Sequence, residues 1–208
     1  MPVHDETSEY ARWQARFASA DYAFGKEPNY FLKSCRKLLP PRGRALAVAD
    51  GEGRNGVWLA EQGLEVVSLD FSPAGQTKAR ALAAERGVRM AFIEADVHDW
   101  DYPQSAFDVV VEIFAQFSPP SQRAIKWRGM RRALKSGGLL IVQGYTPKQL
   151  HYGTGGPKQL DHLYTRTMLE EEFGDFRDVQ IVEEEREMRE GDSHAGMSAV
   201  IGVTATKP

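Results

Sequence analysis

The chain has 208 residues, a net charge of −3, 42% hydrophobic residues and 26% charged residues. These values are ordinary for a globular α/β domain that buries a core without disulfides, and the single cysteine, Cys35, excludes an intramolecular disulfide. The small negative charge gives no general attraction to nucleic acid or to a membrane surface. The beginning of the chain lacks a secretory-signal pattern, and its apolar runs are too short to span a bilayer. We therefore expect a soluble cytoplasmic protein, and these values leave open whether it is a monomer or a homodimer.

The first two thirds of the chain alternate strand-like and helix-like segments. Residues 8–38 predict two short helices joined by an aromatic loop at 21–31. Continuous apolar runs then predict buried strands, at residues 45–49, 65–70, 89–96, 107–114 and 138–145. Helices are predicted between them, over 55–62, from Ser72 to Gly87, and from Ser118 to the glycine pair at 137–138. This last helix carries a basic stretch that we expect on its solvated face, made of Lys126, Arg128, Arg131, Arg132 and Lys135.

The last third of the chain has a different pattern. A glycine-rich loop at 151–158 is followed by a predicted helix at 165–173. Strand-like segments at 179–188 and 199–206, separated by a turn around Gly191-Asp192, predict an antiparallel hairpin. The fold class is therefore α/β, with a doubly wound, mostly parallel seven-stranded sheet that ends in this hairpin. We expect one domain over residues 1–208, with residues 1–38 as a helical cap.

A glycine turn between the first strand and its helix predicts a nucleotide site. The sequence Asp50-Gly51-Glu52-Gly53-Arg54-Asn55-Gly56 fits G-x-G-x-x-G, in which glycines allow a ligand close to the backbone and to a helix N-terminus. Asp70, at the tip of the second strand, can accept both hydroxyls of a ribose. Asp96 ends the third strand and can accept a hydrogen bond from an adenine amino group, while Val97 offers an amide and an apolar wall.

Several segments of the chain resemble the class I S-adenosylmethionine (SAM)-dependent methyltransferases, in particular a small bacterial group similar to tellurite-resistance methyltransferases. The resemblance rests on YAFGKEPNYFL, ADGEGRNGVWLAEQG, EVVSLDFSPAGQTKARALA, FDVVVEIFAQF, LKSGGLLIVQGYTPKQL and YGTGGPK. It implies a Rossmann-like methyltransferase fold, SAM as the cofactor, and transfer of its methyl group to a small acceptor such as a soft oxyanion or a thiol.

The chain departs from the usual Asp-x-Gly-x-Gly-x-Gly loop of that class at two positions. Ala47 stands where the acid falls, and Ala49 stands for the first glycine. A carboxylate at residue 47 therefore cannot hold the methionine ammonium group. Asp50, backbone carbonyls, or Glu112 on the fourth strand are the candidates to replace it.

The expected cofactor-binding residues come from the aromatic loop, the glycine turn and the ends of three strands. They are Tyr22, Phe24, Gly25, Asn29, Asp50, Gly51, Gly53, Asn55, Asp70, Phe71, Ser72, Asp96, Val97, Glu112, Phe114 and Phe117. Aromatic faces among them can hold the positive sulfonium by cation–π attraction. Core packing is an equally good reading of Phe114 and Phe117.

Methyl transfer from a sulfonium needs positioning and exclusion of water more than acid–base groups. We therefore name no catalytic residue, and we expect no metal. The glycine-rich loop at 151–158 should hang over the carboxyl edge of the sheet, opposite the aromatic segment at 22–29. Tyr152, Lys158 and His194 are the candidate acceptor-binding residues.

Two alternative functions stay open at this point. An NAD(P)-dependent oxidoreductase would also use G-x-G-x-x-G, although the terminal hairpin, Asp96 and the lack of a Tyr-x-x-x-Lys pair argue against it. A non-catalytic SAM-binding protein is compatible with the missing loop acid at Ala47.

Overall fold

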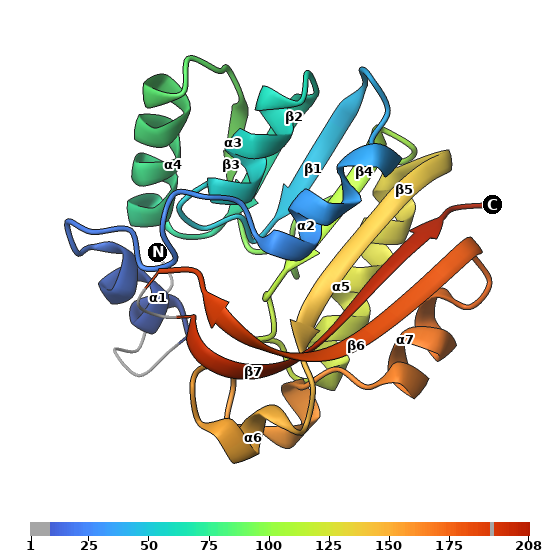
Figure 1. Ribbon diagram of the computed structural model, residues 1–208. Coiled ribbons are helices and arrows are strands. Elements are labelled where there is room, and N and C mark those ends of the chain that lie inside the picture. Colours follow the sequence, from blue (N-terminus) through green and yellow to red (C-terminus); the bar gives the residue numbers. More distant parts are fainter. Residues whose placement is uncertain (1–8, 192–193) are drawn as a thin grey trace.

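The computed structural model describes residues 9–191 and 194–208, which form a seven-stranded sheet with the order β3-β2-β1-β4-β5-β7-β6 (Figure 1). The first five strands are parallel, and they are β1 (Arg44–Val48), β2 (Glu65–Asp70), β3 (Ala91–Glu94), β4 (Phe107–Ile113) and β5 (Leu134–Tyr145). β1 lies between β2 and β4. The strand order therefore reverses at β1, and in open α/β sheets ligands bind at the carboxyl edge of such a point.

One face of the sheet is covered by the helices that follow the N-terminal segment and the first two strands. These are α2 (Tyr30–Ser34), the 3-10 helix η1 (Cys35–Leu38), α3 (Arg54–Glu61) and α4 (Pro73–Glu85). Leu32, Trp58 and Leu59 pack against Ala47 and Val111 of the strands. Cys35 is buried in the same cluster, in agreement with a packing role.

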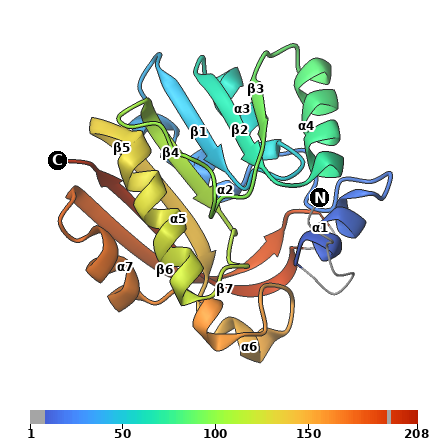
Figure 2. The same ribbon diagram turned by 180° about the vertical axis from the view of Figure 1, so that it is seen from behind.

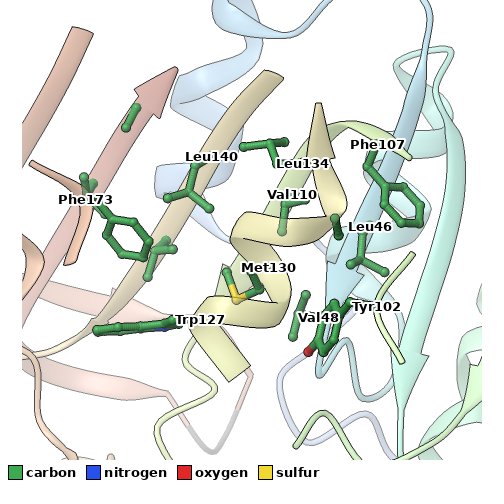
Figure 3. Packing of buried hydrophobic residues seen from close by; sticks show 14 of the residues in the cluster. Leu46, Val48, Tyr102, Phe107, Val110, Trp127, Met130, Leu134, Leu140 and Phe173 are labelled. Atoms are coloured by element: carbon green, nitrogen blue, oxygen red, sulfur yellow. The ribbon is translucent and has the colours of Figure 1, made fainter. Parts of the chain in front are cut away.

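The opposite face carries α5 (Pro120–Ala133) and α7 (Arg166–Phe173), as the reverse view shows (Figure 2). Trp127 and Met130 of α5 and Phe173 of α7 pack with Val110 and Leu140 of the sheet (Figure 3). Full burial of each such side chain contributes roughly 1.5–3 kcal/mol. Because the strands are covered on both faces, they read in the sequence as continuous apolar runs.

The antiparallel end of the sheet is formed by β6 (Arg177–Arg189) and β7 (Ala195–Thr206), and β7 pairs with β5. Both strands are long, and their hairpin bends past the carboxyl edge of the parallel strands towards α1 (Glu9–Phe17) (Figure 1). The connection from β5 contains α6 (Gln149–Tyr152) and the 3-10 helix η2 (Leu160–His162). The predicted fold class, with its terminal hairpin, is confirmed; the predicted turn residue Asp192 lies outside the described residues.

Three details of the predicted elements are wrong. The helix expected from Ser118 begins at Pro120, because Ser118 points its hydroxyl at His98 Nε2, 2.7 Å away. It ends at Ala133 rather than at the glycine pair, because Leu134 already pairs with Phe107 as the start of β5. The third strand stops at Glu94, two residues before Asp96.

The basic stretch of α5 is not entirely solvated. Lys126 is completely buried, and its Nζ lies 2.8 Å from Glu112 Oε1. Burial lowers the pKa of the Lys126 ammonium group, while Glu112 opposes that shift. Within the described part of the chain, no helix is long and apolar enough to cross a membrane.

Candidate functional site

A cavity of about 680 Å³ lies at the carboxyl edge of the parallel strands. Its wall is formed by the ends of β1, β2, β4 and β5, by α1 and the aromatic loop, by residues 155–159, and by the beginning of the last strand. The residues predicted for the site that line it are Phe24, Asp50, Gly51, Asn55, Asp70, Phe71, Phe114, Phe117, Lys158 and His194. Segments far apart in the sequence therefore meet at one cavity, at the position where the sheet order reverses.

Two non-glycine residues in the cavity wall have left-handed backbone conformations. Ala49, after β1, has φ of 52°, and Phe114, after β4, has φ of 55°. Ala49 occupies the first glycine position of the related loop, so its conformation is one that glycine adopts without strain. Such conformations cost about 1–3 kcal/mol each and persist where the surrounding structure requires them, often at ligand sites.

The two glycines of the turn have different roles: Gly51 forms part of the cavity wall, and Gly53 allows close packing within the fold. Gly51 lines the cavity, with φ of 57°. Gly53 does not line it: a Cβ there would lie 2.6 Å from Ala79 Cβ of α4, so this glycine allows α4 to pack closely against the turn. The expectation that Gly53 admits the ligand to the backbone is replaced by this packing role.

The Asp50 side chain stabilises the glycine turn through two hydrogen bonds. Its Oδ1 accepts the N–H of Gly56 at 3.0 Å, and its Oδ2 accepts the hydroxyl of Ser68 at 2.8 Å. Both oxygens are therefore engaged inside the protein, although the residue borders the cavity. Asp50 therefore stabilises the turn, and, as for Asp70, the second lone pair of each oxygen stays available to a ligand.

Asp70 ends β2 beside the glycine turn and lines the cavity. Its carboxylate accepts the N–H groups of Gly51 and Ser72, each at 2.8 Å. Burial, together with the smaller effect of the Asp50 charge, raises the pKa of Asp70 to about 6, although the two N–H donors oppose the shift. Each oxygen has a second lone pair, so the group can still accept ribose hydroxyls.

The structure does not bring Asp96, Val97 or Ser72 to the cavity wall. Asp96 Oδ1 accepts the N–H of His98 at 2.8 Å and lies 2.7 Å from its Nδ1, and this hydrogen bond lowers the pKa of Asp96. Val97 is buried in the core, and its carbonyl accepts the Tyr102 hydroxyl. Ser72 caps α4 by accepting the N–H of Gly75.

Three expected residues of the N-terminal segment lie behind the wall rather than in it. Tyr22 donates its hydroxyl to the carbonyl of Lys78 on α4. Asn29 is fully buried, caps α2, and donates its backbone N–H to Asn55 Oδ1 at 2.9 Å. Gly25, with φ of 71°, packs against Gly191 at the tip of the hairpin.

The expectation that Glu112 faces the cavity is wrong. Its side chain lies on the α5 face of β4 and is fully buried. Its two oxygens accept hydrogen bonds from Lys126, Trp127 and Tyr164, at 2.8, 2.7 and 2.6 Å. This carboxylate joins α5 and the β5–α7 connection to the sheet, and no ammonium group of a ligand can reach it.

The three acceptor candidates separate in the structure. Lys158 and His194 line the cavity, and residues 155–159 border it, as do Phe24 and α1. Tyr152 lies in α6 and donates its hydroxyl to the carboxylate of Glu185, outside the cavity wall. The structure therefore does not bring Tyr152 to the site.

Sequence reasoning missed a second group of wall residues. Arg12, Trp13, Arg16 and Phe17 of α1 border the cavity. The signal available in the sequence was an amphipathic helix with aromatic and arginine side chains, but its orientation depends on packing against α4. Glu52 and Arg54 of the glycine turn and Gln116 and Tyr145 at the strand ends were also missed.

The charges in the wall are only partly compensated. Arg54 Nη1 lies 2.7 Å from Glu190 Oε2, and Lys78 Nζ lies 2.8 Å from Glu52 Oε1. Arg16 lies over the rings of Trp13 and Phe24, and burial lowers the pKa of its guanidinium group. Among residues 9–191 and 194–208, no group of three or more His, Cys, Asp or Glu side chains is placed to hold a metal ion.

Comparison with known proteins places this geometry in a class. Residues 45–138 match the model of a methyltransferase domain. A demethylmenaquinone methyltransferase from Thermus thermophilus is 32% identical over 138 residues, which are 65% of this chain and 55% of that protein. The chain spans about half the length of the curated relatives it matches.

Solved structures share the fold over almost the whole chain. TehB from Haemophilus influenzae has a TM-score of 0.72 at 14% identity, covering 96% of this chain and 67% of TehB. Phosphoethanolamine N-methyltransferase 2 from Haemonchus contortus, in complex with SAM, has a TM-score of 0.71 at 16% identity, covering 98% and 59%. The fold is that of the class I SAM-dependent methyltransferases. The resemblance predicted from the sequence is supported at the level of the fold, since TehB is among the solved structures that share it.

Proposed function

We propose that this protein binds SAM in the cavity at the carboxyl edge of the sheet and transfers its methyl group to a small-molecule acceptor. The observation that carries the proposal is the convergence of Gly51, Asp70 and an aromatic wall at the point where the strand order reverses. The match to a methyltransferase domain and the SAM-bound structural neighbour support the same cofactor.

The nucleoside is assigned to the β2 side of the cavity. Asp70 accepts the ribose hydroxyls from a position beside Gly51. Phe71 follows Asp70 directly in the sequence and its ring centroid lies 5.9 Å from that of Phe117, and both rings line the cavity. An adenine ring held against Phe71 and Phe117 gains stacking area. Asp96, which is outside the wall, has no part in this arrangement.

The methionine end of SAM is assigned to the glycine turn, where Glu52 supplies the carboxylate that is missing at Ala47. Glu52 Oε2 is buried and has no hydrogen-bond partner among the described residues. A buried carboxylate oxygen normally has a partner, and the methionine ammonium group supplies one. Glu52 follows Gly51 directly and borders the cavity.

Transfer itself needs an acceptor in line with the S–CH3 bond and a site without water. Trp13, Phe24, Phe114 and Phe117 give the cavity an apolar lining, and their ring faces attract the positive sulfonium. The S–CH3 bond breaks with its electron pair on sulfur, which leaves S-adenosylhomocysteine. The residues of this chain hold the two reactants together and exclude solvent.

The experiment that tests the activity is a screen of small acceptors with the purified chain and SAM. The readout is the formation of S-adenosylhomocysteine, because this product is common to every acceptor. The proposal is supported if the wild-type chain methylates at least one acceptor faster than the Asp70→Ala variant does. Tight binding of S-adenosylhomocysteine without any transfer would instead indicate a non-catalytic SAM-binding protein.

A further inference from the structure

Besides Glu52 Oε2, two other buried polar atoms in the cavity wall have no hydrogen-bond partner among the described residues. They are the Tyr145 hydroxyl oxygen, at the end of β5, and His194 Nδ1, beside the start of β7. Tyr145 is 1% exposed and His194 is 6% exposed. Leaving a buried polar group without a partner costs about 1–3 kcal/mol, so two such groups in one wall indicate a ligand that carries hydrogen-bonding atoms.

Tyr145 and His194 are neighbours in a corner of aromatic rings, with the charges of Arg54 and Glu190 nearby. Their ring centroids lie 5.7 Å apart, with the planes nearly perpendicular at 89°. The Phe114 ring lies 4.5 Å from each of them, and Phe24 lies 4.5 Å from His194. A small apolar body with one hydrogen-bonding group fits this corner.

His194 is held in place by the tip of the hairpin. Its carbonyl accepts the N–H of Glu190 at 2.9 Å. Glu190 in turn pairs with Arg54 and accepts the backbone N–H of Tyr30. A Cβ on Gly191 would lie 2.6 Å from the Gly25 nitrogen, so the tip sits directly on the aromatic loop. Such support fixes a side chain well enough for chemistry.

The corner leaves His194 uncharged and Tyr145 protonated. Burial, together with the charges of Arg54 and Arg16, lowers the pKa of His194 to about 3. Burial and the Glu190 charge raise the pKa of the Tyr145 hydroxyl, while Arg54 and the nearby Ser198 side chain lower it. At neutral pH the imidazole therefore accepts a hydrogen bond through one ring nitrogen, and the tyrosine hydroxyl donates one.

We propose that Tyr145 and His194 form the acceptor subsite and that the acceptor is a protic nucleophile, a thiol or a hydroxyl, whose proton passes to His194. This inference rests on the methyltransferase activity proposed above. Tyr145 donates to a lone pair of the acceptor atom and orients it, while the imidazole accepts its X–H hydrogen bond.

The step balances without another reactant. A lone pair of the acceptor atom forms the new bond to the methyl carbon, and the S–CH3 bond breaks with its electrons on sulfur. The X–H proton becomes strongly acidic as the methyl bond forms, so even a weakly basic imidazole takes it up. The imidazolium returns the proton to solvent when the product leaves. An acceptor whose nucleophilic atom is already anionic carries no proton for the His194 imidazole to accept.

The test compares two variants, His194→Gln and Tyr145→Phe, with two matched controls outside the cavity wall, His151→Gln and Tyr152→Phe. Methyl transfer is measured with benzyl mercaptan and catechol as protic probes and with sodium selenite as an anionic probe. Calorimetry with S-adenosylhomocysteine reports the cofactor site separately, and thermal unfolding reports the fold.

We expect the wild-type chain to methylate a protic probe and both variants to lose roughly 100-fold or more of that rate, the usual scale for a general acid–base group. Affinity for S-adenosylhomocysteine should stay within about twofold in both, since neither residue holds the cofactor. The two controls should keep the wild-type rate.

Four results would overturn the inference. They are wild-type rates in both variants, an equal loss in the controls, a large loss of S-adenosylhomocysteine affinity in the variants, and transfer to selenite with none to a thiol or catechol. Binding of S-adenosylhomocysteine by the wild-type chain without transfer to these three probes also counts against it, and the wider acceptor screen then decides whether the chain transfers a methyl group at all. If the wild-type chain does not bind S-adenosylhomocysteine, the proposed function itself fails, and this outcome is distinct from the others.

Discussion

Glu52 and Lys78 form an ion pair in which only one carboxylate oxygen takes part. Oε1 lies 2.8 Å from Lys78 Nζ and also accepts the N–H of Ala23 at 3.2 Å. Oε2 is buried without a hydrogen-bond partner in the described part of the chain. The pair thus ties the glycine turn to α4 and to the aromatic loop, and it leaves one oxygen of a charged group available to a cationic ligand.

Glu52→Gln is expected to weaken S-adenosylhomocysteine binding by about 1.5–3 kcal/mol, because the ammonium group of the ligand loses its charged partner. Isothermal titration calorimetry measures the change. Glu85→Gln, which removes an exposed ion pair between α4 and Lys26 of the aromatic loop, serves as the control and should leave the affinity unchanged. Equal affinities for Glu52→Gln and the wild-type chain would assign the ammonium group to backbone carbonyls instead.

Asp70 should make cofactor affinity depend on pH. Its ionised carboxylate accepts the ribose hydroxyls, and its pKa is raised to about 6 by burial. We expect S-adenosylhomocysteine affinity to fall by up to about tenfold per pH unit as the pH drops below 6. Calorimetry from pH 8 to pH 5 measures the slope. In Asp70→Asn the affinity should be weaker and flat over this range; an identical slope in that variant would exclude Asp70 as the titrating group.

The same group predicts a change in stability with the opposite sign. The folded-state pKa of about 6 lies above the ordinary value of 3.8, so between these values the folded state binds more protons than the unfolded state. The contribution of Asp70 to the free energy of unfolding therefore falls as the pH rises from about 4 to about 6. Urea unfolding of the ligand-free chain should show this decrease relative to Asp70→Asn, and parallel curves for the two proteins would contradict it.

Gly53→Ala is expected to destabilise the fold. Gly53 and Gly87 both have left-handed backbone conformations, with φ of 85° and 68°, but a Cβ at Gly87 meets nothing within 4 Å. Gly87→Ala should therefore cost only the backbone strain of roughly 1–2 kcal/mol. Gly53→Ala adds overpacking against Ala79, worth about 1–3 kcal/mol. Urea denaturation of the two variants compares these costs, and equal losses would show that α4 yields at this contact.

The pair of Arg54 and Glu190 should hold the hairpin tip against the glycine turn. Its atoms lie 2.7 Å apart, and both side chains are about nine-tenths buried. Glu190→Ala leaves Arg54 buried without its partner, so we expect a loss of about 3 kcal/mol in the free energy of unfolding. Glu187→Ala, which removes an exposed pair with Arg189 on the same strand, should change stability by less than about 1 kcal/mol. Similar losses in both variants would mean that the buried pair adds nothing to the hairpin.

The sequence predicted the fold well because its signals are local. Continuous apolar runs marked the central strands, Ser72 and Pro73 marked the start of α4, and two consecutive strand-like segments marked the hairpin. The boundaries failed where tertiary contacts decide. Ser118 reads as a helix cap but bonds to His98, and Leu134 reads as helical but pairs with Phe107.

The site was predicted less completely, for a physical reason. Residues at strand ends, such as Asp70 and Phe114, are placed by topology alone. Topology alone does not determine on which face of the sheet a side chain of β4 lies. The period-2 alternation places Glu112 on the α5 face only once the register of β4 with β5 is known. The α1 wall and the orphaned oxygen of Glu52 depend on packing between segments far apart in the sequence.

The central claim is that this cavity binds SAM, and titration of the wild-type chain with S-adenosylhomocysteine and with NADH tests it most directly. The account predicts one-site binding of S-adenosylhomocysteine by calorimetry, weakened by about 1.5–3 kcal/mol in Asp70→Ala, and no saturable binding of NADH by fluorescence. Saturable binding of NADH together with no heat from S-adenosylhomocysteine would contradict the account and assign the glycine turn to a dinucleotide.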